Sequence, residues 1–259
     1  MNKYISTWYL MSLNSFASML VSRLGGLLFL LGKTLRFIFF LIFLLIITQK
    51  QQTIAGYTQS QAILFFLTFN VIDTTSQFFF REVYRFRQLV VSGNLDLVLI
   101  KPISPLFRSL LGGADIFDLF MIIPFIVATA WVALLQHPTV IDSILFILLI
   151  FSGLGIAAAF HILVLALGIL TTEIDHAVMI YRDLTSTGRI PIDVYREPVR
   201  GFLTFIVPVG IMMTTPAKAL LGLVSPFGVI FAFAVSGISI LISLFFWQFA
   251  LRRYTSASS

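Results

Sequence analysis

The chain has 259 residues, of which 59% are hydrophobic and 11% are charged, and its mean hydropathy is +1.02. Because a soluble globular domain carries roughly 25% charged residues, this composition excludes a soluble globular protein and predicts an integral membrane protein. The absence of cysteine excludes disulfide scaffolds, thiolate metal sites and cysteine nucleophiles, while the formal net charge of +6 raises the question of nucleic-acid binding.

The predicted elements are all helical and make up one membrane domain over residues 1–259. A mixed polar and aromatic segment at about 4–21 predicts a helix that lies at the membrane surface. Six apolar segments follow, and we interpret them as transmembrane helices because about 20 helical residues cross a ~30 Å hydrocarbon core. They cover about 24–48, 60–80, 114–135, 141–171, 201–215 and 226–251. The fifth is short, and we expect a small hairpin at the outer face after it. The expected fold class is therefore all-α, with six transmembrane helices.

Basic residues predict the orientation of the chain, since cytoplasmic connections of membrane proteins are enriched in lysine and arginine. All but two of the 17 basic residues, Lys50 and Lys218, fall in the N-terminal segment, in the connections at roughly 81–113 and 172–200, or at the C-terminus. We therefore expect both termini and both long connections in the cytoplasm, where they can meet soluble partners. Nucleic-acid binding would need these charges on one soluble face and is not expected.

The stretch that ends in Gly-Lys-Thr at residues 32–34 resembles a nucleotide-binding P-loop only in part. The motif needs a glycine five positions before Gly32, but Leu27 stands there and the residues between are apolar. The chain is therefore expected neither to bind ATP nor to be an enzyme, and any ATP and Mg²⁺ would be bound by a partner. Lys33 and Arg36 instead fall within the first predicted span, from which long side chains are expected to snorkel to an interface.

A second partial motif, Gly153, Gly155 and Ala158, has the spacing of a dinucleotide fingerprint, which requires a preceding strand. It lies inside the fourth predicted span. We therefore interpret Gly153 with Ala157, and Gly155 with Ala159, as small-residue pairs that let helices in lipid pack closely. No catalytic set and no metal-ligand cluster has the required spacing, so no catalytic or metal site is expected.

Four polar residues of the second predicted span recur at helical spacing and share one helix face: Asn70, Asp73, Thr74 and Gln77. A carboxylate inside the membrane is costly and tends to face a protein interior or water. One interpretation is that this stripe lines the substrate path, with Asp73 attracting a cationic or amphipathic substrate. The alternative is a structural ion pair of Asp73, for instance with Arg36 on the first predicted span.

The connection after the second predicted span is the most informative part of the chain. It begins with the basic residues Arg85 and Arg87, breaks at Gly93, continues with the apolar stretch LDLVLI and stops at the Lys101-Pro102 pair. A short rod bounded by glycine and proline could transmit a push from a docked partner to the two flanking spans. The alternative is an ordinary cytoplasmic loop.

This connection resembles the signature of the ABC-2-type exporter permeases, G-x-L-D-x-x-L-x-[KR]-P-[IVL]-[SN]-P-L-F. The matching residues are Gly93, Leu95, Asp96, Leu99, Lys101, Pro102, Ile103, Ser104, Pro105, Leu106 and Phe107. The C-terminal segment is similar to the ending of the same family through Trp247, Leu251, Arg252, Arg253 and Tyr254. The likeness extends over nearly the whole chain.

The resemblance implies an N-terminal elbow helix, cytoplasmic coupling helices, a second permease subunit (the same or a paralogous chain) and two ABC ATPase subunits docked on the cytoplasmic connections. The residues that it implies for coupling to the ATPase are Arg85, Arg87, Gly93, Leu95, Asp96, Leu99, Lys101, Pro102 and Pro105.

The expected function is the permease subunit of an ATP-binding-cassette exporter in the plasma (inner) membrane, which moves its substrate outward with ATP hydrolysed by separate subunits. The alternative is a secondary transporter or channel without an ATPase partner. Such proteins usually show repeated halves or charged relays within the membrane, and we find no convincing repeat. Drug-like cations, lipids and glycoconjugates all stay open as substrates.

Overall fold

The computed structural model describes residues 3–21, 23–51, 53–171 and 174–255. Within these ranges the chain is helical, and the only β-type pairing is an isolated bridge between Ile54 and Tyr57. Five of the described helices are long and apolar enough to cross a membrane, or up to six if one bent pair counts as a span. The all-α membrane fold predicted from the sequence is confirmed.

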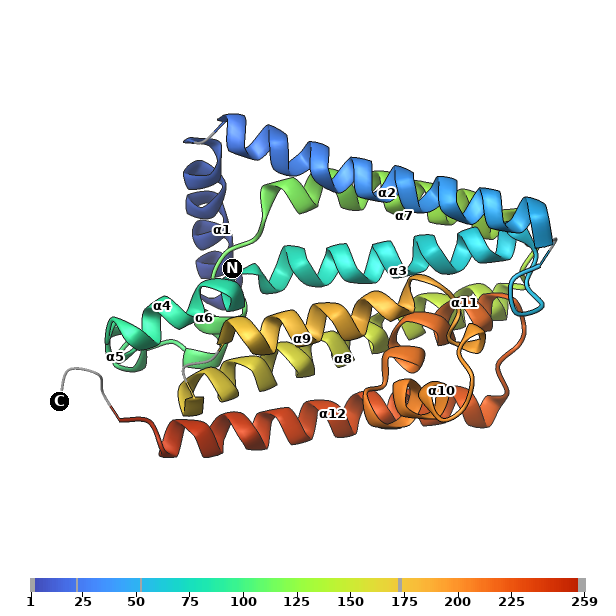
Figure 1. Cartoon of the computed structure of the whole chain (residues 1–259). Coiled ribbons are helices and arrows are strands. Elements are labelled where there is room, and N and C mark those ends of the chain that lie inside the picture. The colour runs from blue at the N-terminus through green and yellow to red at the C-terminus, as the bar shows by residue number, and fades with distance from the viewer. Residues whose placement is uncertain (1–2, 22, 52, 172–173, 256–259) are drawn as a thin grey trace.

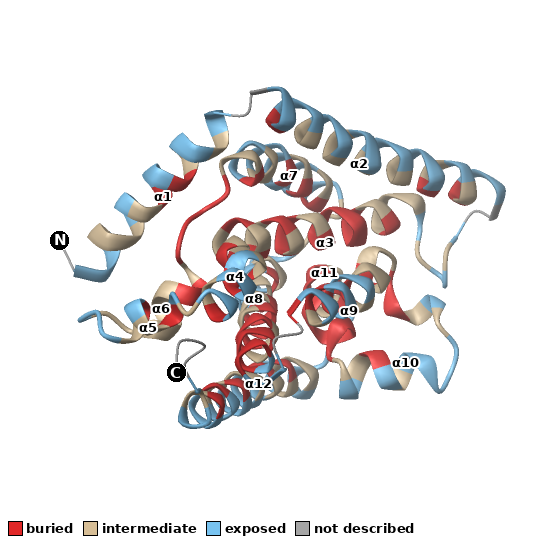
Figure 2. Ribbon diagram, turned by 60° about the vertical axis from the view of Figure 1, so that its left-hand side comes forward, coloured by how far each residue is buried: buried red, intermediate tan, exposed pale blue. Residues whose placement is uncertain are grey.

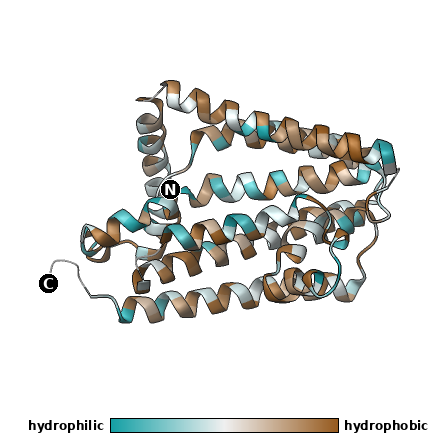
Figure 3. Ribbon diagram, viewed as in Figure 1, coloured by the Kyte–Doolittle hydropathy of each residue, from teal (hydrophilic) through white to brown (hydrophobic). Residues whose placement is uncertain are grey.

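The long helices form the body of the molecule (Figure 1). They are α1 (Lys3–Val21), α2 (Arg23–Gln51), α3 (Gln59–Phe80), α7 (Ile116–Leu134), α8 (Val140–Thr171) and α12 (Pro226–Arg252). The interior helices are α3 and α8, whereas α2 and α12 are mostly exposed (Figure 2). Apolar residues run along the exposed helices (Figure 3), as expected of surfaces that face lipid.

Shorter helices gather at the two ends of the bundle, which we name the α5 end and the α11 end (Figure 1). The α5 end holds η1 (Arg81–Arg85), α4 (Phe86–Val91), α5 (Leu95–Leu99) and α6 (Pro105–Leu110). Helix α1 lies across this end, and α12 finishes there. The α11 end holds the connection between α2 and α3 together with η3 (Ile192–Val194), α10 (Val199–Gly201), η4 (Phe202–Ile206) and α11 (Thr215–Leu220).

Side-chain caps determine where several helices begin. The Thr58 hydroxyl and the Gln61 side chain form a capping box at the start of α3, and the Asp115 carboxylate accepts hydrogen bonds from backbone N–H groups in the first turn of α7. Ser225 caps α12 just before Pro226. Because such caps contribute about 0.5–2 kcal/mol each, they fix the positions at which these helices enter the bundle.

The small residues of α8 let two other elements approach closely, as the sequence predicts. A Cβ atom on Gly153 would lie 2.6 Å from the Met212 carbonyl oxygen, and one on Gly155 would lie 2.6 Å from Ser236 Oγ. The Ser236 hydroxyl also donates a hydrogen bond to the Ser152 carbonyl oxygen at 2.9 Å. Helix α8 therefore packs against α12 and against the π-helical turn η5 (Gly210–Thr214).

The fifth predicted span differs from its expected form. Residues 201–215 do not form one straight helix, because Val199–Ile206 and Gly210–Leu220 are two helical pieces bent by 81°. The connection expected before this span is also different, since it contains α9 (Ile174–Ser186) and η2 (Thr187–Arg189), which run back alongside α8 from the α5 end (Figure 1).

Contacts at the α11 end hold the residues that follow η2. The Asp193 carboxylate binds Lys218 Nζ at 2.7 Å and accepts a hydrogen bond from the Tyr57 hydroxyl at 3.0 Å. Burial and this neighbouring carboxylate raise the pKa of Tyr57. Arg200 belongs to α10 at the α11 end, and its backbone N–H donates to the Arg196 carbonyl oxygen at 3.1 Å, so both arginines lie at the end opposite to α5 (Figure 1). The expectation that these arginines share a side with the connection after α3 is therefore wrong.

The amphipathic pattern of α9 explains this placement. Its buried residues recur at helical spacing: Ile174, Val178, Tyr181 and Thr185. This face packs against α8, while Arg182 and Asp183 are exposed on the other face. A helix that is apolar on one face and polar on the other is stable at the boundary between a core and a polar space. The prediction of orientation from lysine and arginine counts treats these residues of α9 as part of a loop.

Candidate functional site

A cavity of about 410 Å³ lies between α2, α3, α7 and the segment formed by α9 and η2. All four residues of the predicted polar stripe on α3 line it: Asn70, Asp73, Thr74 and Gln77. A second cavity of about 400 Å³ shares several lining residues with the first, among them Asp73 and Arg182. The stripe therefore faces a space of the size found in small-molecule sites, which typically measure ~300–1,000 Å³.

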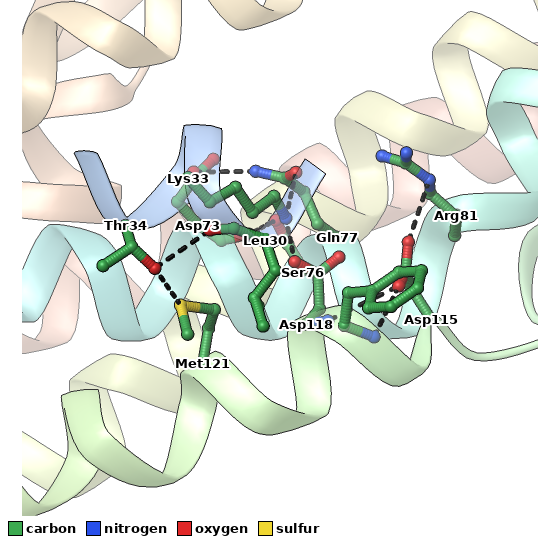
Figure 4. A network of polar contacts seen from close by, with 11 residues as sticks. Leu30, Lys33, Thr34, Asp73, Ser76, Gln77, Arg81, Asp115, Asp118 and Met121 are labelled. Carbon is green, nitrogen blue, oxygen red and sulfur yellow. Dashed lines mark hydrogen bonds and ion pairs between the residues drawn. The ribbon is translucent and has the colours of Figure 1, made fainter. Parts of the chain in front are cut away.

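A network of polar contacts joins α2, α3 and α7 beside this cavity (Figure 4). Lys33 forms an ion pair with Asp118 on α7, and its ammonium group also donates to Gln77 Oε1 at 3.4 Å. Gln77 Nε2 in turn donates to Asp73 Oδ2 at 2.8 Å. The expectation that Lys33 snorkels to an interface is wrong, because a buried carboxylate of the bundle binds it.

The charged residues that line the first cavity are mostly basic. The basic ones are Lys33, Arg36, Arg81, Arg182 and Arg189, and the one acidic residue among the described lining residues is Asp73. Lys33 is paired with Asp118, and Arg81 is paired with Asp115 at 3.2 Å. The positive charges of Lys33 and Arg81 are therefore each neutralised by a carboxylate.

The other three arginines are not neutralised in this way. In the part of the chain that the structure describes, no ion pair within 4.0 Å includes Arg36, Arg182 or Arg189. The proposed structural ion pair between Arg36 and Asp73 is thus not formed, although both residues line the same cavity. Asp73 instead accepts its hydrogen bond from the neutral amide of Gln77.

Aromatic side chains supply the apolar part of the cavity lining. Phe37 and Phe40 stack on Phe66 with ring centroids 5.2 and 4.7 Å apart, and Phe125 lies 4.9 Å from Phe37. The guanidinium group of Arg189 lies over the ring of Phe40 at 5.7 Å. Cationic and aromatic surfaces are therefore adjacent, and the cavity is amphipathic.

The second candidate site is the hairpin formed by η1, α4, α5 and α6 at the α5 end. Gly93, between α4 and α5, has a φ of +72°, a left-handed conformation that glycine adopts without steric cost. Leu95 is fully buried and Leu99 packs against the core. Pro105 begins α6 directly after the Ser104 cap. These predicted residues give the hairpin its shape.

Most of the other predicted coupling residues lie on the outside of the hairpin. The exposed ones are Arg85, Arg87, Lys101 and Pro102. Arg87 approaches Asp175 at the start of α9, at 3.6 Å. Asp96 is half-buried and lies beside Tyr254 of the C-terminal segment, where burial and this carboxylate raise the pKa of Tyr254. The hairpin thus contacts both α9 and the end of the chain.

Two features of the hairpin are not predicted from the sequence patterns. Three apolar residues at its tip, Val91, Leu97 and Ile100, are 57%, 56% and 78% exposed. Glu82 on η1 is buried and binds Arg108 on α6 at 2.8 Å. The signal for this ion pair is that Glu82 is the one acidic residue among the basic residues of the stretch REVYRFR, residues 81–87.

The fold and these two sites define a multi-pass membrane protein with an internal polar cavity and a compact surface hairpin at one end. The family model described as ABC-2 family transporter protein matches residues 34–258. The chain therefore belongs to the ABC-2 family of transporter proteins, which confirms the resemblance seen in its sequence. Such membrane permeases are typically non-catalytic subunits, and the family implies ATPase partners. No curated protein and no solved structure gives a significant match.

Proposed function

We propose that this ABC-2 permease is the transmembrane subunit of an exporter that pairs with a second permease subunit and is driven by separate ATPase subunits. The ATPase subunits bind ATP and Mg²⁺ and dock on the hairpin at the α5 end. That end faces the cytoplasm together with both termini, and the substrate leaves across the plasma membrane through the cavity. The family match over residues 34–258 supports the transporter class.

The surface of the hairpin suits a soluble protein partner. Its exposed apolar tip (Val91, Leu97 and Ile100) offers the kind of apolar centre that protein interfaces commonly have, surrounded by a polar rim. The exposed basic residues of the same hairpin are Arg85, Arg87 and Lys101. An acidic groove on an ATPase subunit would complement this arrangement in both shape and charge.

The observation that carries the proposal is the connection from the hairpin to the cavity. The Glu82–Arg108 ion pair joins α6 to η1, which directly continues α3. The Arg81–Asp115 ion pair joins the end of α3 to the start of α7 (Figure 4). Since α3 and α7 both line the cavity, a displacement of the hairpin by a docked ATPase moves cavity-lining helices instead of being absorbed in a loop.

The test compares two matched substitutions, Leu97→Asp on the hairpin and Leu223→Asp in the loop after α11. These leucines are 56% and 57% exposed, so neither substitution places a charge in the core. The tagged chain is purified from its native membrane, and the subunits are identified by mass measurement. We expect an ATPase subunit with the wild type and with Leu223→Asp, and its loss, along with loss of ATP-driven transport, with Leu97→Asp.

Two results would contradict the proposal. One is the absence of any ATPase subunit from the purified wild-type complex. The other is transport that survives ATP depletion and follows a proton gradient, which would indicate the secondary transporter instead.

A further inference from the structure

The unpaired arginines of the cavity come from three separate elements and converge on one space. Arg36 lies on α2, Arg182 on α9 and Arg189 on η2, and all three line both cavities. The carboxylates near them among the described lining residues are Asp73, in both cavities, and Asp183, in the second. In the first cavity, three guanidinium groups without an ion pair therefore face a single carboxylate.

The position of Arg36 makes this charge imbalance significant. It lies near the middle of the 29-residue helix α2, roughly 20 Å from the first residue at 1.5 Å per residue. A charged side chain at such a depth in a membrane is costly unless it faces water or a counter-charge. Arg36 and Arg182 are exposed to the cavity space, so their guanidinium groups are accessible to a ligand. The sequence predicts that Arg36 snorkels to an interface. In the structure, its side chain lines the cavity instead.

The chemistry of the lining indicates which ligand would supply the missing charge. Guanidinium groups form bidentate, charge-assisted hydrogen bonds with the oxygens of phosphates and carboxylates. The stacked rings of Phe37, Phe40 and Phe66 lie next to Arg189 and offer an apolar surface for the rest of the molecule. A ligand that satisfies both surfaces carries an oxyanion at one end and an apolar body at the other.

We propose that the cavity binds an amphipathic anion, whose phosphate, carboxylate or sulfonate head contacts Arg36, Arg182 and Arg189 while its apolar body packs on the phenylalanine rings. The proposal rests on the proposed function only in taking this ligand as the transported substrate. It differs from the cationic substrate that Asp73 suggests when considered alone, because a cation in the first cavity would meet three guanidinium groups without an ion pair and one carboxylate.

Binding is measured with the purified full-length chain in nanodiscs of neutral phosphatidylcholine, without an ATPase subunit. The probes are radiolabelled dodecyl phosphate and dodecyltrimethylammonium, which have the same tail and opposite charges. We expect saturable binding of dodecyl phosphate and at least tenfold weaker binding of the cation. Inorganic phosphate is the competitor, and we expect it to displace the probe only weakly. Tighter binding of the cation would overturn the proposal, and displacement by phosphate at equal concentration would overturn its amphipathic part.

Substitutions locate the site. Arg36→Gln and Arg182→Gln are each expected to weaken dodecyl phosphate binding about tenfold, the effect of losing a hydrogen bond to a charged group. Asp73→Asn is expected to tighten binding several-fold because it removes a repelling carboxylate, a gain that misfolding does not produce. The control is Arg196→Gln, an exposed arginine that lines neither cavity.

Unchanged binding in both arginine variants, or weaker binding in Asp73→Asn, would overturn the proposal. Since the assay contains no ATPase, saturable anion binding by a protein that shows no ATP-driven transport would contradict the exporter assignment alone. ATP-driven transport without anion binding would contradict the ligand assignment alone.

Discussion

The two interrupted basic segments of the chain, 81–113 and 174–224, fold in opposite ways although both contain arginines, prolines and glycines. The first remains at the end of the bundle as a hairpin of short helices with an exposed apolar tip. The second runs back into the bundle as α9 and then forms the bent helices of the α11 end (Figure 1). The difference lies in the continuity of the apolar face. In α9 this face is unbroken, whereas the helices of the hairpin are interrupted at Gly93, in the left-handed conformation.

This difference separates the roles that we assign to the basic residues of the two segments. Arg85 and Arg87 are exposed on the hairpin, where a soluble partner can reach them. Arg182 and Arg189 line the cavity beside Asp73. Similar local composition therefore supplies a docking surface in one segment and a ligand-binding surface in the other.

The largest expected effect is an all-or-none difference in accessibility between the two segments. Because the chain contains no cysteine, the single variants Leu97→Cys and Arg196→Cys report their positions separately. The two residues lie at opposite ends of the bundle. A membrane-impermeant maleimide added to intact cells is expected to label Arg196→Cys, and to label Leu97→Cys only after the membrane is permeabilised.

The two ways in which this labelling can fail have different meanings. Labelling of both positions from one side would contradict the placement of the second segment. Reversed labelling would leave that placement intact and contradict the cytoplasmic hairpin, and with it the docking of an ATPase there.

A smaller effect tests whether the second segment packs on α8. The Cβ atom of Gly153→Val would lie 2.6 Å from the Met212 carbonyl oxygen, a backbone atom that cannot rotate away. Overpacking of this kind typically costs about 1–3 kcal/mol, so we expect a lower thermal unfolding midpoint. The control is Gly237→Val on α12, since no side chain or other backbone of the described residues lies within 4 Å of a Cβ there. Equal midpoints would mean that η5 does not press on α8.

The long apolar helices could be predicted from the sequence because crossing a hydrocarbon core leaves an apolar segment of that length few alternatives. Helices α9 and η2 could not, because Arg182, Asp183 and Arg189 give them the composition of a polar connection. The charge rule counts basic residues in loops and does not recognise a helix that packs in the bundle. The bend in the fifth predicted span has a visible cause, since Pro208 at the break has no N–H to donate.

The candidate cavity could be predicted only in part. The spacing of the α3 stripe places Asp73 and Gln77 on one helix face, and that face does line the cavity. The net charge around Asp73 could not be deduced from the sequence. Its basic neighbours, Arg36 and Arg182, belong to other helices and are far from Asp73 along the chain. Only the return of α9 alongside α8 brings these charges together.

Two glycines with the same backbone conformation can separate local strain from coupling. Gly93 in the hairpin has a φ of +72°, and Gly222 after α11 has a φ of +69°. Alanine in this left-handed region costs about 1–2 kcal/mol at either position, so Gly93→Ala and Gly222→Ala are expected to lower the unfolding midpoint by similar amounts. Only Gly93→Ala should also reduce the substrate transported per ATP hydrolysed, because it alone shifts the hairpin tip relative to η1. An equal loss of coupling in Gly222→Ala would show that strain anywhere in the bundle has this effect. Normal coupling in Gly93→Ala would show that the shape of the hairpin does not control transport.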